Sequence, residues 1–114
     1  MSTDQALLEL YFESLANRRG ELQRGWDELR TGVGDEATVQ RIKNHLHQLA
    51  GSAGAYGFAG LGDAARTLEL VCADWLGAES AARDDVDRFS RRSQGDFDEL
   101  DYQLEFVLQR AASA

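Results

Sequence analysis

The 114-residue sequence contains no proline. Because proline breaks helices in their interior, its absence permits long uninterrupted helices. No stretch shows the alternation of apolar and polar residues that is typical of β-strands. The composition is rich in the helix formers Ala, Leu, Glu, Arg and Gln. The sequence therefore predicts an all-α protein, and its length predicts a single domain over residues 1–114 with one modest core.

Cysteine and long apolar runs are also scarce. Cys72 is the only cysteine, so no disulfide can form within the chain, and a reducing compartment is favoured. We expect Cys72 to be a core thiol. No apolar run approaches the ~20 residues that span a bilayer, and the N-terminus lacks the basic and apolar segments of a signal peptide. These absences predict a cytoplasmic protein.

Positive charge is outnumbered by negative charge. Twelve Lys and Arg residues stand against 20 Asp and Glu residues, which gives a formal net charge of −8 at pH 7. Such an excess disfavours nucleic acid or an anionic membrane surface as the main partner, because both repel an acidic protein. The acidic side chains are expected to form a solvated surface.

Apolar residues recur at helical spacing in four segments. We expect helices at about residues 4–31, 36–54, 59–76 and 80–112. Ser2 and Thr3 are N-cap candidates for the first helix, with Gln5 three residues after Ser2 as in a capping box. Asp35 is expected to cap the second helix and Ser80 the last.

Glycines leave two of these helices open to interruption. Gly20 allows a bend in the first helix or its division into two, and the polar stretch around Gly95 allows a break near that residue in the last. Four amphipathic helices with short connections predict an antiparallel up-down four-helix bundle, most simply a monomer. The long first and last helices are expected to pair and to extend past the two shorter ones.

The second helix carries a histidine on its outer side. On a helical wheel of about 100° per residue, His47 falls about 120° from the centre of the apolar stripe, so we expect it to be largely exposed. Ala50 lies between that side and the core. The side of His47 is shared by Gln40, Lys43, Gly51 and Gly54.

Glycine inside a helix costs about 1 kcal/mol relative to alanine, so two on one side of a helix need a reason. Gly51 and Gly54 leave a flat strip of backbone beside the His47 imidazole. A docking protein could bring a reactive group to the ring there. Lys43, one turn before, could offer a positive charge to an anion on the ring.

The other parts of an enzyme site are missing. His45 falls on the opposite flank, and neither histidine has a metal-ligating residue four positions later, which disfavours a metal or haem site. No acidic residue pairs with a histidine at an evident spacing. The sequence has no phosphate-binding loop and no G-x-S-x-G elbow. Any chemistry at His47 therefore depends on groups supplied by another protein.

The run from His47 to Gly57, HQLAGSAGAYG, resembles the signature of histidine phosphotransfer (HPt) domains of bacterial phosphorelays. That signature reads roughly H-x-[LI]-K-G-[SA]-[SA]-x-x-[LVIF]-G. The resemblance implies that His47 is the phosphoacceptor, through Nε2, and that Gly51 leaves room for a receiver domain.

The same resemblance implies a role and its partners. The chain would accept a phosphoryl group from a receiver aspartate or a hybrid kinase and pass it to the receiver of another response regulator. It would be a carrier without an ATP site or cofactor of its own, and Mg²⁺ would be bound by the partner receiver.

Two positions depart from the signature. Ala50 stands where the family usually has lysine, and Lys43 is the candidate substitute; Tyr56 replaces an aliphatic residue. The dimerisation domains of sensor kinases also carry such a histidine, but usually with an acidic residue after it, where this chain has Gln48. The missing lysine keeps a second hypothesis open, a binding module that docks on receivers or another signalling protein without carrying phosphate.

Overall fold

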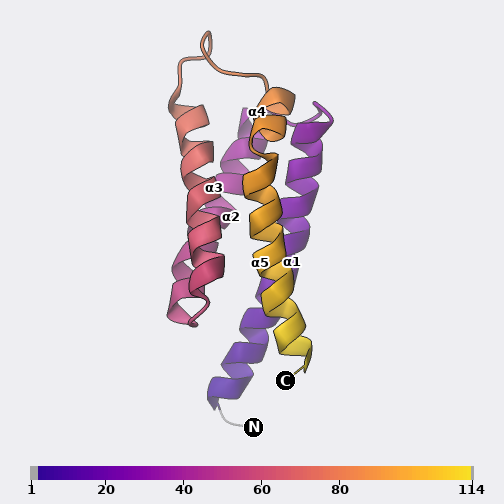
Figure 1. The fold of residues 1–114 in the computed structure, drawn as a ribbon, viewed down its shortest axis with the longest axis vertical. Coiled ribbons are helices and arrows are strands. Elements are labelled where there is room, and N and C mark those ends of the chain that lie inside the picture. The colour runs from indigo at the N-terminus through magenta and orange to yellow at the C-terminus, as the bar shows by residue number, and fades with distance from the viewer. Residues whose placement is uncertain (1–2, 114) are drawn as a thin grey trace.

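A computed structural model describes residues 3–113 of the chain. Within that range the structure contains five α-helices and no strand, which confirms the all-α prediction. The helices are α1 (Thr3–Arg30), α2 (Glu36–Ala55), α3 (Ala59–Gly77), α4 (Val86–Arg92) and α5 (Gln94–Ser113). Figure 1 shows them lying along the long axis of a body 55 Å in length. The proposed cap at Ser2 lies outside the described residues.

The first helix is continuous through Gly20, so the alternative of two separate helices is wrong. Next to that glycine, Arg19 donates two hydrogen bonds to the Asp101 carboxylate in α5, at 2.8 and 3.0 Å. These hydrogen bonds lower the pKa of Asp101. α1 and α5 therefore pair side by side, and Figure 1 shows both extending past the turn between α2 and α3, as predicted.

The second helix begins where the sequence predicts. The Asp35 side chain accepts a hydrogen bond from the Thr38 amide at 3.2 Å, and the Thr38 hydroxyl accepts one from the Asp35 amide at 3.1 Å. This reciprocal capping satisfies two amides that lack partners in the first turn. At the other end Gly57 has a φ of +84°, a conformation that favours glycine, and the chain reverses there into α3.

The prediction of a helix from Ser80 is wrong. α4 begins at Val86, and its N-cap is Asp85, which accepts from the Arg88 amide at 3.1 Å. The residues before it are held against the end of α3 instead. Trp75 Nε1 donates to the Asp84 carbonyl at 2.9 Å, and the Arg83 guanidinium lies 4.6 Å from the Trp75 ring centroid. These contacts favour a non-helical connection over residues 78–85.

The last helical segment is interrupted near Gly95, as predicted, and the junction lies at Ser93. Ser93 is buried at the junction of α4 and α5. Its amide donates to the Phe89 carbonyl at 3.0 Å, and its carbonyl accepts from the Phe97 amide at 3.2 Å. The four-residue hydrogen-bond spacing thus continues across the junction, so α5 follows on from α4.

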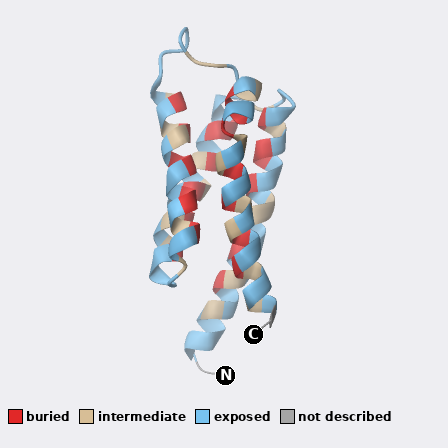
Figure 2. Ribbon diagram, viewed as in Figure 1, coloured by how far each residue is buried: buried red, intermediate tan, exposed pale blue. Residues whose placement is uncertain are grey.

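The core lies between the helices, and Figure 2 shows its buried residues in the middle of the body, with the N-terminal end of α1 exposed. Cys72 is part of this core, and burial raises the pKa of its thiol to about 12, as expected for a core thiol. Leu46 and Leu49 of α2 are fully buried. Burying each contributes about 1.5–3 kcal/mol, which fixes the rotation of α2 and turns position 47 outward.

Candidate functional site

His47 projects from the middle of α2 with 71% of its side chain exposed, as the helical wheel predicts. Its ring is not free, however. The His47 Nδ1 atom lies 2.7 Å from Oε2 of Glu69 in α3. The sequence shows no acidic residue at an evident spacing from a histidine, and this pair was not predicted because the two residues meet across two helices, 22 positions apart.

Glu69 is held in place by burial. Only 10% of its side chain is exposed, and within the described part of the chain its Oε1 atom accepts no hydrogen bond. The nearest cation is Arg66, whose Nη1 atom lies 3.9 Å from Glu69 Oε1. A buried carboxylate with one oxygen on the imidazole is a fixed partner, because burial restricts its rotation.

The contact with Glu69 determines which nitrogen of His47 is reactive. A carboxylate oxygen only accepts hydrogen bonds, so the proton of the neutral ring lies on Nδ1 and the lone pair lies on Nε2. Imidazole is a nucleophile through its unprotonated nitrogen. The pairing therefore leaves an unprotonated Nε2 on an exposed imidazole.

An open groove with a volume of about 430 Å³ lies beside the ring, between α2 and α3. Its α2 side contains Ala50, Gly51 and Gly54 as well as His47. Its α3 side is lined by Ala59, Gly62, Asp63 and Arg66. Three of the predicted site residues thus meet His47 at one surface.

The glycines on the α2 side are open to solvent. A Cβ atom added at Gly51 or at Gly54 would meet no heavy atom within 4 Å. Packing within the chain therefore does not require glycine at either position. What glycine provides is a low surface beside the imidazole, over which another protein could approach.

Two predicted site residues lie away from this groove. Lys43 is half-buried one turn before His47, and Gln40 is exposed and donates to the Asn44 side chain at 3.0 Å. Neither lines the groove. Lys43 as a substitute for the missing lysine stays a prediction.

His45 lies on the other flank, as predicted, in a different environment. Its Nδ1 atom accepts a hydrogen bond from Arg18 Nη1 at 2.9 Å. Burial, reinforced by the Arg18 charge, lowers the pKa of His45. The guanidinium only donates hydrogen bonds, so the ring proton of neutral His45 lies on Nε2. The Nδ1 lone pair is used by Arg18, and the ring has no other free lone pair.

Sequence reasoning missed Glu69, although one signal was present. In the predicted third helix Ala65, Cys72 and Leu76 form a buried or half-buried stripe, and position 69 falls within it. A carboxylate on such a stripe needs a polar partner, because burying a charge alone is costly. That partner could have been sought among the exposed histidines of the preceding helix.

Among residues 3–113, no three His, Cys, Asp or Glu side chains are grouped so as to hold a metal ion. None of the helices in that range combines the length and apolar character needed to cross a membrane.

The model of the Hpt domain family matches residues 6–113, nearly the whole chain. A search of curated proteins and a search of solved structures both give no match. Hpt domains are histidine phosphotransfer modules of phosphorelay signalling, where they act with receiver domains and kinases. From the match over residues 6–113, this chain belongs to the Hpt domain family.

Proposed function

We propose that His47 is the phosphoacceptor of a phosphorelay carrier. The observation that supports this most strongly is the 2.7 Å contact between His47 Nδ1 and Glu69, on an imidazole that is otherwise exposed beside a groove. This contact leaves the Nε2 lone pair available at a surface that another protein can reach. The donor is a phosphorylated aspartate of a receiver domain or hybrid kinase, and the acceptor is an aspartate of a second receiver.

The transfer step exchanges one bond to phosphorus for another. The Nε2 lone pair forms the N–P bond while the bond between phosphorus and the aspartyl oxygen breaks, and the aspartate leaves as a carboxylate. The ring keeps its Nδ1 proton and becomes positively charged, so the Glu69 carboxylate stabilises it. Onward transfer is the reverse step with a second receiver aspartate.

The partner completes the site. The receiver supplies Mg²⁺ and the reactive aspartate, while this chain supplies position and access and needs no cofactor of its own. We propose a monomeric, cytoplasmic protein with no nucleic-acid partner. Its residues form one domain, in which α4 and α5 serve together as the last helix of an antiparallel four-helix bundle. Continuous hydrogen bonding across Ser93 supports that assignment.

The test is incubation with a receiver domain phosphorylated at its aspartate, using wild type, His47→Gln and the matched control His45→Gln. Wild type and His45→Gln should gain an acid-labile label, and His47→Gln should gain none. A label retained by His47→Gln would contradict the proposal. If no variant is labelled while receiver binding persists in all three, the chain is a binding module and not a carrier.

A further inference from the structure

A phosphoryl group on His47 would bring strong negative charge into a site that already contains a carboxylate. Such a group carries about −1.5 to −2 charges at pH 7. Glu69 lies on the opposite nitrogen of the same ring, and Asp63 lines the groove. Like charges this close repel, even with partial screening by solvent. The positively charged ring offsets only part of this negative charge, so a second cation nearby would stabilise the phosphorylated site.

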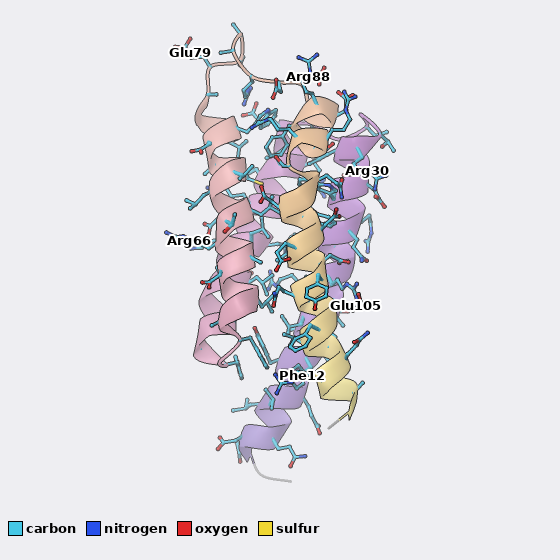
Figure 3. All side chains as sticks on the ribbon, in the orientation of Figure 1. Phe12, Arg30, Arg66, Glu79, Arg88 and Glu105 are labelled. Carbon is cyan, nitrogen blue, oxygen red and sulfur yellow. The ribbon has the colours of Figure 1, made fainter. Side chains whose placement is uncertain are left out.

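The groove contains one candidate. Among the described residues that line it, Arg66 is the only one with a permanent positive charge. Ala50, Gly51 and Gly54 add none on the α2 side. Arg66 is 62% exposed, so its guanidinium can move without displacing core side chains. Figure 3 shows Arg66 on the outer side of α3.

The packing of α2 against α3 places Arg66 opposite the reactive ring. Glu69 meets His47, and a Cβ added to Gly62 would lie 3.5 Å from the Ala50 carbonyl oxygen. Arg66 lies between Gly62 and Glu69 on α3, about one turn from each. It therefore faces the turn of α2 that runs from His47 to Ala50.

Arg66 is also close to the charge that it would have to offset. Its Nη1 atom lies 3.9 Å from Oε1 of Glu69, the oxygen that accepts no hydrogen bond in the described part of the chain. At that distance the two groups attract without a hydrogen bond that would hold the guanidinium in place. Arg66 therefore stays near the His47 ring, and its guanidinium can still turn toward another anion.

From this arrangement we propose that Arg66 binds the phosphoryl oxygens on His47. In the unphosphorylated protein the guanidinium stays beside Glu69; after transfer it donates N–H bonds to the phosphoryl group, for which its planar fork is suited. This inference rests on the proposed function of His47. Lys43 is the competing cation, but it lies outside the groove.

The test uses phosphoramidate as a small donor, so that receiver docking does not enter. The His47 Nε2 lone pair attacks phosphorus, the P–N bond breaks, and ammonia leaves. The pKa of the phosphoryl group is then measured by ³¹P NMR titration in wild type, Arg66→Ala, Arg66→Lys and Lys43→Ala. Arg24→Ala is the matched control, since Arg24 is equally exposed on α1 and pairs with Glu21.

Arg66→Ala should raise the phosphoryl pKa and reduce about fivefold the equilibrium constant for transfer from a phosphorylated receiver. Arg66→Lys should restore part of both effects, as should adding Ala50→Lys to Arg66→Ala, which places a cation on the opposite side of the groove. Arg24→Ala should match wild type. Circular dichroism should show the same helix content in every variant.

Three results would overturn the role of Arg66 while leaving the phosphoacceptor in place. The first is an unchanged phosphoryl pKa in Arg66→Ala, and the second is a larger effect from Lys43→Ala. The third is a changed tautomer of unphosphorylated His47 in Arg66→Ala, read from ¹⁵N shifts, which would mean that Arg66 acts by positioning Glu69. Absence of any label on wild-type His47 would instead refute the proposed function itself.

Discussion

His45 and His47 are two residues apart on α2, and each makes a hydrogen bond through Nδ1, but to opposite kinds of partner. His47 meets the Glu69 carboxylate at 2.7 Å, and His45 meets the Arg18 guanidinium at 2.9 Å. A carboxylate accepts and a guanidinium donates, so the two rings hold their protons on different nitrogens. Only His47 is left with an unprotonated Nε2.

The helix surface is also less crowded beside His47 than beside His45. Beside His47 the helix surface is low, since Gly51 and Gly54 leave open space. Beside His45 stand the longer side chains of Arg41, Asn44 and Gln48. Under the proposed function, exposure alone does not make a histidine a phosphoacceptor. The ring also needs a hydrogen-bond acceptor at Nδ1 and an uncrowded surface beside it.

The largest effect on transfer is expected from placing a large side chain on the open surface beside His47. Gly51→Trp should slow transfer from a phosphorylated receiver on the order of 100-fold, because the indole would hold the donor away from the ring. The melting temperature should not fall, since a Cβ atom at position 51 meets no heavy atom within 4 Å and the substitution replaces a helix-disfavouring glycine. Transfer is measured by the rate of label appearance on the chain.

The matched control for that change is Gln48→Trp on the His45 flank, where transfer should stay within twofold of wild type. Equal inhibition by both tryptophans would mean that the receiver covers both flanks. Extensive unfolding of Gly51→Trp would show that position 51 is not on an open surface.

A smaller effect on transfer is expected from removing the Glu69 charge that contacts Nδ1 of His47. Glu69→Gln keeps the size of the side chain but loses the carboxylate, so transfer should slow about tenfold, in line with a hydrogen bond to a charged group. Asp63→Asn removes an equal charge from the groove beside His47 and leaves the contact between Glu69 and the ring in place, so it should have little effect. Similar rates for the two variants would reduce Glu69 to a general electrostatic role.

The smallest effect concerns His45 and appears in stability. Because burial and Arg18 lower its pKa, the folded protein resists protonation at a pH where the unfolded chain, near the ordinary value of 6.5, accepts a proton. Stability at this site is therefore present above pH 6.5 and is lost as the pH falls from there toward the lower folded pKa. His45→Gln should flatten this part of the stability curve, measured by urea unfolding from pH 7.5 to 5. An unchanged slope would contradict the environment assigned to His45.

The sequence predicted much of this site because most of it lies on one helix. The apolar stripe through Leu46 and Leu49 was enough to turn His47 outward and to place Gly51 and Gly54 beside it. Glu69 was missed because its contact depends on how α3 packs against α2, and no spacing along the chain encodes that register. Arg66 was missed for the same reason.

In the fold, the departures also come from contacts between distant segments. Ser80 is a good N-cap residue by type, but Trp75 and Arg83 hold the chain after α3 in a connection that delays the helix to Val86. By contrast, local preference predicted a break near Gly95, and the junction falls two residues earlier, at Ser93. Single-helix patterns were reliable here, and the errors arose where one helix constrains another.

We propose that Glu69 leaves Nε2 of His47, and of no other histidine, ready to accept the phosphoryl group. Long-range ¹H–¹⁵N correlation spectra of ¹⁵N-histidine-labelled protein, before and after phosphorylation by a receiver, test it most directly. We expect unphosphorylated His47 to be protonated on Nδ1 and His45 on Nε2, and phosphorus to appear on Nε2 of His47 alone. A His47 ring protonated on Nε2, or phosphorus on Nδ1 or on His45, would contradict the account.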